Sequence, residues 1–166
     1  MHREGHIGAA LLAYAPLLML ALVVGSTDLA LAGGLAAVGL AMLPDQDQRV
    51  PGIDHRGITH TVHFAAVVGG VLAVVGLVVG ATRGPLAGIG WGVFGFAVGS
   101  GVIGSHIAAD ALTPMGVEPY RDGRHYSYDV AKAANPLANY ALLVLGVLSV
   151  GIAYVVGATV GAVVGI

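Results

Sequence analysis

The stretch LPDQDQRVPGIDHRGITH, residues 43–60, is a polar segment between two long apolar runs. It concentrates side chains that bind metal ions through oxygen or nitrogen: Asp45, Asp47, Asp54, His55 and His60. A loop that is polar only because it contacts water ordinarily uses Lys, Glu, Ser and Gly, and it does not need two histidines around Arg-Gly-Ile-Thr. The chain has no cysteine, so thiolate-bound zinc is excluded. The stretch therefore predicts a metal site of carboxylates and imidazoles, and its flanks predict apolar helices.

Outside this stretch the chain is too apolar for a water-soluble domain. Of its 166 residues, 57% are hydrophobic and 10% are charged, and the mean hydropathy is +0.87. Soluble domains carry about 25% charged residues, so we expect the lipid bilayer to be the solvent and partner of this protein. The length suits one domain over residues 1–166. The net charge of −2 and the lack of a basic stripe argue against a nucleic-acid partner.

The apolar runs predict an all-α, polytopic membrane bundle of about five helices. These runs cover residues 7–25, 29–43, 62–80, 86–112 and 137–164. The first could be mistaken for a secretory signal peptide, but its length and the run that follows favour a retained helix. The second run is short for a full span and stops at Pro44, so whether it crosses the bilayer stays open.

Charge sets the expected orientation. Five spans place the N-terminus, residues 44–60 and residues 113–136 on one side, with six basic residues there: Arg3, Arg49, Arg56, Arg121, Arg124 and Lys132. Only Arg83 falls on the other side, so the positive-inside rule makes the first side cytoplasmic. All seven histidines lie on that side or in the adjoining helix ends: His2, His6, His55, His60, His63, His106 and His125. Histidine has no reason to segregate by this rule, so a shared site is the simplest cause.

One pair of candidate ligands lies inside a predicted membrane helix. His106 and Asp110 are four residues apart, which places both on one helix face. Ionisable residues at this depth are costly unless they pair, bind an ion or line a wet cavity. A simple hydrogen-bonded pair is the alternative. The other helix ends at this level also carry ligand-type residues: His6, Asp45, Asp47, His60 and His63.

Three motifs carry a resemblance to a known family. They are Leu43-Pro44-Asp45-Gln46-Asp47, His55-Arg56-Gly57-Ile58-Thr59-His60, and His106-Ile107-Ala108-Ala109-Asp110-Ala111-Leu112-Thr113-Pro114-Met115-Gly116. The chain resembles, from His6 to about Pro119, the LexA-regulated inner-membrane metal-dependent hydrolases, small multispanning proteins of bacteria and archaea. The resemblance implies an inner-membrane hydrolase with a bound divalent metal, and it implies no substrate.

Carried over by matching position, the metal ligands are Asp45, His60, His106 and Asp110, with His6 as a fifth. Mixed nitrogen and oxygen ligands favour zinc or manganese. Asp47 and His55 are candidates for the general base or for a second metal. Arg56 either binds an anionic oxygen of the substrate or is an ordinary basic residue that sets the orientation in the membrane. The pattern fixes no role for His2 or His63.

We therefore expect metal-assisted hydrolysis at the cytoplasmic membrane face, on an ester or phosphoester of a lipid-like substrate. The rival hypothesis is a divalent metal or proton transporter that uses the same cluster. A third is a relative whose metal only ties the helices together. A transporter needs polar residues through the midplane, and the outer halves of the five runs carry almost none.

Two further features bear on partners. Glycines four residues apart, at Gly95 and Gly99 and at Gly157, Gly161 and Gly165, allow close helix packing. The sequence leaves open whether those faces meet within one chain or form a homo-oligomer. The stretch Tyr120–Tyr126 is basic and aromatic, and is either a lid at the lipid headgroups or a plain surface loop.

Overall fold

The computed structural model describes residues 1–165 and confirms the all-α prediction. Its elements are α1 (Arg3–Val23), α2 (Thr27–Leu40), the short 3-10 helices η1 (Pro44–Arg49) and η2 (Ile58–His60), α3 (Val62–Ala81), α4 (Pro85–Ala111) and α5 (Pro136–Val164). Within the described range there is no strand, only one bridge between Val117 and Tyr126. Helix α1 begins before the predicted apolar run because Glu4 in its first turn suits the positive end of the helix dipole.

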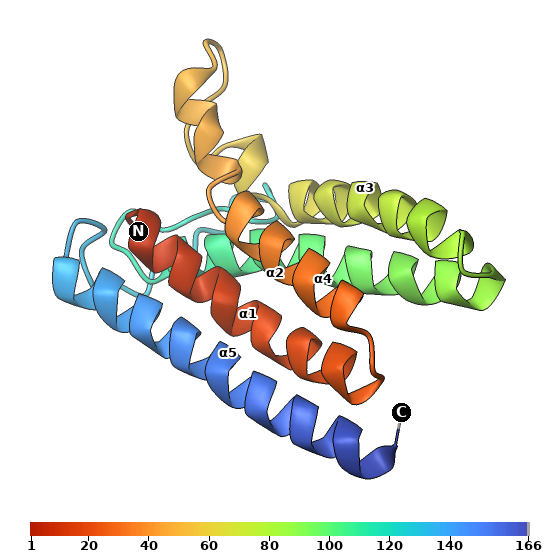
Figure 1. The fold of residues 1–166 in the computed structure, drawn as a ribbon. Coiled ribbons are helices and arrows are strands. Elements are labelled where there is room, and N and C mark those ends of the chain that lie inside the picture. Colours follow the sequence, from red (N-terminus) through yellow and green to blue (C-terminus); the bar gives the residue numbers. More distant parts are fainter. Residues whose placement is uncertain (166) are drawn as a thin grey trace.

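Four of the helices, α1, α3, α4 and α5, are long and apolar enough to cross a membrane. Helix α2 has only 14 residues, or about 21 Å at 1.5 Å per residue, and is shorter than a bilayer core of about 30 Å. It nevertheless runs antiparallel to α1 and returns the chain to the end that holds the N-terminus (Figure 1). The N- and C-termini lie at opposite ends of the bundle, as five passes require.

Small residues bring the helices together in two main pairs, α1 with α5 and α3 with α4. On α4, Gly95 and Gly99 face the backbone of α3, where a side chain would not fit. On α5, Gly157 and Gly161 face α1 in the same way. These glycines, whose partners the sequence left open, therefore pack within the chain.

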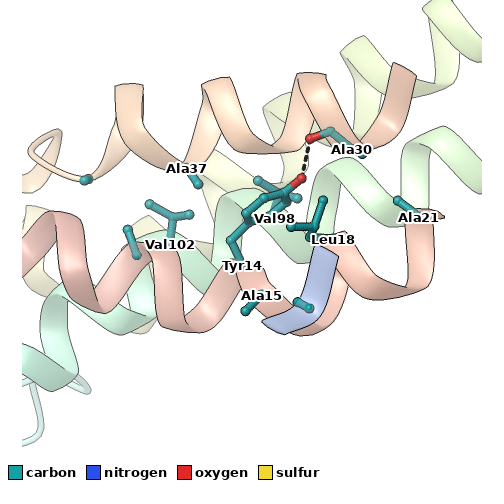
Figure 2. Packing of buried hydrophobic residues seen from close by; sticks show 11 residues of the cluster. Tyr14, Ala15, Leu18, Ala21, Ala30, Ala37, Val98 and Val102 are labelled. Atoms are coloured by element: carbon teal, nitrogen blue, oxygen red, sulfur yellow. Dashed lines mark hydrogen bonds between the residues drawn. The ribbon is translucent and has the colours of Figure 1, made fainter. Parts of the chain in front are cut away.

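A buried tyrosine connects the short helix to the rest of the bundle. Tyr14 of α1 is 3% exposed, and its hydroxyl donates a hydrogen bond to the backbone carbonyl of Ala30 on α2. Figure 2 shows the ring among small and branched core side chains from three helices: Ala15, Leu18, Ala37, Val98 and Val102. This contact fixes the first turn of α2 against α1, and α2 then runs back toward the end of the bundle where Pro44 begins the polar segment.

The ends of the helices that reach the polar segment have clear chemical causes. Thr61 caps α3, because its hydroxyl oxygen accepts a hydrogen bond from the backbone N–H of Phe64 at 3.1 Å. Asn135 caps α5 by accepting from the backbone N–H of Ala138 at 3.2 Å, and Pro136 takes the first helical position. Because Thr61 caps α3, the preceding residue His60 lies at the end of the bundle that holds the polar segment.

Candidate metal centre

All five residues predicted as metal ligands lie in one cluster, joined by contacts between imidazole nitrogens and carboxylate oxygens. They come from four elements: His6 from α1, Asp45 from η1, His60 from η2, and His106 and Asp110 from α4. The side chains of His6, His60, His106 and Asp110 are at most 1% exposed, and that of Asp45 is 12% exposed. The i, i+4 spacing in α4 does place His106 and Asp110 on one face.

Within this cluster the imidazole Nε2 atoms face carboxylate oxygens. His60 Nε2 lies 3.4 Å from Asp45 Oδ1 and 3.4 Å from Asp110 Oδ2. His106 Nε2 lies 3.4 Å from Asp45 Oδ1, and His6 Nε2 lies 3.5 Å from Asp110 Oδ1. One ligand atom from each of His6, Asp45, His106 and Asp110 lies within 4.8 Å of the others. These separations exceed a good hydrogen bond and suit donors that surround a common centre.

The tautomer of His106 follows from its outer partner. Its Nδ1 is 2.7 Å from the backbone carbonyl oxygen of Ala41, which can only accept, so Nδ1 carries the proton. In the neutral ring, Nε2 then directs a lone pair toward the carboxylate of Asp45. Two electron-rich groups facing each other in a buried site are unfavourable unless a proton or a metal ion lies between them.

His60 has the same arrangement. Its Nδ1 is 3.0 Å from the hydroxyl oxygen of Thr59, and that hydroxyl donates its own proton to Asp47 Oδ2 at 2.8 Å. Nδ1 is therefore the donor and Nε2 faces Asp45 and Asp110. Burial lowers the pKa of His60, but the carboxylates of Asp110 and Asp45 outweigh this and raise it above its usual value. The cluster thus favours positive charge at this nitrogen.

Several buried atoms of the cluster have no hydrogen-bond partner: Nε2 of His6, His60 and His106, and Oδ2 of Asp110. Each such atom costs about 1–3 kcal/mol when left unpaired. The rings of His6 and His106 also stack, with centroids 3.6 Å apart and planes 7° apart, which disfavours two protonated imidazoles. A divalent cation held by His6, Asp45, His106 and Asp110, which form one group of candidate ligands, would satisfy Nε2 of His6 and His106 and Oδ2 of Asp110, so the residues fit the predicted metal.

Asp47 lies beside the cluster and uses both of its oxygens. Oδ1 is 3.0 Å from His55 Nδ1, and Oδ2 accepts from Thr59 Oγ1 at 2.8 Å and from the backbone N–H of Arg56 at 3.2 Å. Burial raises the pKa of the Asp47 carboxyl, but the contacts with Thr59, His55 and His60 outweigh this and hold it below its usual value. Asp47 therefore orients neighbouring side chains through both of its oxygens.

Arg56 is bound to the protein by both terminal nitrogens. Nη1 donates to the carbonyl oxygen of Gly116 at 2.7 Å and to Thr113 Oγ1 at 3.2 Å, and Nη2 donates to Asp110 Oδ1 at 3.0 Å. The amino group of Met1 contacts the same Asp110 oxygen at 2.5 Å. Arg56 thus joins the polar segment to the end of α4 and balances the charge of Asp110.

Three further histidines differ in whether they lie close to the candidate ligands. His2 and His63 are exposed and belong to neither group of candidate ligands. His55 is different: its side chain is 37% exposed, and it offers a ligand atom within 4.8 Å of atoms of Asp45 and His60. It is the member of the site that solvent reaches most readily.

Sequence reasoning missed three positioning groups. Thr59 lies inside the His-Arg-Gly-Ile-Thr-His motif, so its place beside His60 was the available signal. Asn139, a lone amide in the first turn of α5, accepts from the backbone N–H of His2 at 2.9 Å and anchors the start of α1. The carbonyl of Ala41 is backbone and leaves no signal in the sequence.

Residues 1–164 match the family model described as YdjM inner membrane protein. No curated protein and no solved structure matches the chain. The match covers the whole bundle and every residue of the cluster.

Proposed function

The chain belongs to the YdjM inner membrane protein family, and we propose that it is a metal-dependent hydrolase embedded in the membrane. The observation that carries the proposal is the set of buried, unpaired Nε2 atoms of His6, His60 and His106 around two carboxylates. A bound divalent ion supplies Lewis acidity, which lowers the pKa of a water and polarises an ester or phosphoester bond. Regulation by LexA, which the sequence resemblance implies, stays a prediction.

The protein's own residues divide the remaining work. Asp45, His106, Asp110 and His6 would hold the cation, for which zinc or manganese suits the mixed donors, and His60 lies beside them with its Nε2 3.4 Å from Asp45 and Asp110. His55 is exposed to solvent and its Nδ1 is held by Asp47, so its Nε2 is free to take a proton from water or to bind a second ion. Asp47 is a positioning residue for His55.

A cleft beside His55 supports an anionic substrate. It has a volume of about 290 Å³. Its wall includes the charged or titratable side chains of His55, Arg56, Glu118, Arg121 and His125. A neighbouring groove is apolar and is lined by Tyr120, Tyr126 and Tyr128. Val117 lines both, so a polar and an apolar surface adjoin, which suits a lipid-like ester or phosphoester.

The orientation follows from charge. The end of the bundle that holds the cluster also holds six of the seven basic residues. We therefore assign the N-terminus and the metal centre to the cytoplasmic side and the C-terminus to the other side. The opposite positions of the two termini agree with this assignment (Figure 1).

The transporter hypothesis receives less support from the distribution of polar groups. Within residues 1–165 the buried polar side chains all belong to the cluster end: His6, Asp47, His60, Thr61, His106, Asp110, Thr113 and Asn139. At the far end, Arg83 pairs with Asp28 at 2.7 Å, and both are well exposed. A transport path needs polar groups near the midplane, so hydrolysis at one face accounts better for this distribution.

The test is hydrolysis by purified protein. Detergent-solubilised protein loaded with zinc or manganese is assayed on phosphoester and ester substrates in mixed micelles. We expect turnover that a chelator removes and the metal restores, and that His106→Ala abolishes while His63→Ala preserves. A metal-loaded protein that hydrolyses none of them, yet moves a divalent ion across liposomes in a His106-dependent way, would favour the transporter.

A further inference from the structure

The donor atoms at the site fall into two groups that share one carboxylate. The first group is His6, Asp45, His106 and Asp110, and the second is Asp45, His55 and His60. We propose that the second group binds its own divalent cation, so that the centre is dinuclear and Asp45 bridges the two ions. This inference rests on the proposed function, which supplies the first ion.

The outer contacts of the second group are those of metal ligands. A ligating histidine almost always donates its other ring N–H to a carboxylate, a carbonyl or water. Asp47 holds His55 at Nδ1 through one oxygen at 3.0 Å, and through the other it approaches Nδ1 of His60 at 3.4 Å. In both rings Nε2 is therefore the nitrogen that remains free to bind the second cation. His106, in the first group, is held at Nδ1 by the carbonyl of Ala41 in the same manner.

Asp45 is placed to serve both ions. Its Oδ1 lies 3.4 Å from Nε2 of His60 and 3.4 Å from Nε2 of His106, which belong to different groups. Its Oδ2 lies 3.8 Å from Nε2 of His6. The ring centroids of His55 and His60 are 5.4 Å apart and nearly perpendicular, at 87°. Asp45 is therefore a carboxylate with imidazole donors of both groups beside it, which is the position that a ligand shared by two ions requires.

The unpaired Nε2 of His60 also fits a second ion better than the first. This atom is fully buried and has no hydrogen-bond partner, although two carboxylates lie 3.4 Å away. Its ring is not a member of the first group. A second cation would give Nε2 of His60 a ligand where it now lies. The first ion could bind this atom only if His60 moved closer to His6.

The two sites differ in exposure, and this predicts an order of binding. Three of the four first-group side chains are at most 1% exposed, whereas His55 is 37% exposed. The second ion would have only three protein ligands and an open position for water or substrate. We therefore expect it to bind more weakly and to exchange faster than the first. Paired ions can clamp the attacking and leaving oxygens of an in-line displacement at phosphorus, so of the two proposed substrate classes the inference favours phosphoesters over carboxylic esters.

The experiment measures stoichiometry rather than activity. Metal-free protein in detergent is dialysed against rising Mn²⁺, and bound manganese per chain is determined by elemental analysis together with electron paramagnetic resonance. We expect two ions per chain, bound in two phases, with an exchange-coupled signal at saturation. His55→Gln should bind one ion and lose the coupled signal. His125→Gln, which changes another exposed histidine of the same cleft, should keep two.

Retention of the first ion in His55→Gln reports that the variant is folded. One ion per chain in the wild type, removed by His106→Ala, would overturn the second site and leave the proposed function standing. No bound ion in the wild type would overturn both. Two ions in His55→Gln would also overturn the assignment of His55.

Discussion

The Nδ1 atom of His106 lies 2.7 Å from the backbone carbonyl oxygen of Ala41, so the short helix α2 orients a ring that α4 carries. Tyr14 in turn holds α2 through the carbonyl of Ala30. Helix α2, which is shorter than the bilayer core, therefore helps to position a ligand of the metal centre. The positions of Asp45 and Ala41 both depend on where α2 ends.

Removing either α4 ligand should remove the tightly bound ion. His106→Ala deletes an Nε2 donor and Asp110→Ala deletes a carboxylate, and both side chains are buried among the other ligands. We expect elemental analysis of purified protein to find the ion in wild type and almost none in either variant. His63→Ala is the control, because that ring is exposed. Full occupancy in both variants would place the metal elsewhere.

Replacing Asp47 should weaken metal binding without deleting a ligand. In Asp47→Asn one acceptor oxygen becomes an amide donor, so His55 and His60 cannot both be held through Nδ1. Changes to such outer partners typically cost about 10–100-fold in metal affinity or activity, and we expect a loss in this range. Competition with a chromophoric chelator measures it. Asp54→Asn, on the exposed part of the same loop, should bind like wild type, and an equal affinity for Asp47→Asn would refute the positioning role.

Tyr14→Phe should destabilise the bundle by removing one buried hydrogen bond. The net loss expected for such a bond is about 1 kcal/mol, together with a buried carbonyl at Ala30 left without this partner. Unfolding in a graded detergent titration measures the change. Tyr140→Phe is matched in chemistry but alters a ring that is 56% exposed, and it should have little effect. Equal stabilities for the two variants would count against the role given to Tyr14.

Two glycines on α5 offer a matched comparison of helix packing. A side chain on Gly146 would meet the backbone of Gly8 in α1, whereas one on Gly151 would meet nothing within 4 Å. Gly146→Ala should therefore force the helices apart, and overpacking of this kind typically costs about 1–3 kcal/mol. Gly151→Ala should be neutral or slightly stabilising. The same unfolding titration compares them, and the reverse order would mean that α1 and α5 do not pack as described.

Topology can be tested independently of chemistry. Reporter fusions after Gly52 and at the C-terminus should lie on opposite sides of the membrane, with Gly52 in the cytoplasm. The reason is that α3, α4 and α5 cross between these points. Reporters on the same side would mean that one of these three helices does not cross the membrane.

Much of this architecture could be predicted from the sequence because a bilayer imposes simple rules. Apolar run length located the helices to within a few residues, and the convergence of His6, His60 and His106 followed from their places at one set of helix ends. The roles of the glycines could not be predicted, since small-residue spacing is the same for contacts within and between chains. The hydrogen-bond partners of the two Asp47 oxygens could not be predicted either, because they depend on how the chain turns between η1 and η2.

X-ray absorption spectroscopy on the metal-loaded protein tests the central claim most directly. Measured at the edge of the bound ion, the spectrum should contain only nitrogen and oxygen ligands. It should also contain the outer-shell scattering of imidazole rings, since His6, His60 and His106 present unpaired Nε2 atoms. In His106→Ala the imidazole scattering should fall or the ion should be lost. A spectrum with no imidazole scattering, from folded protein that carries the ion, would contradict a metal centre built by these residues.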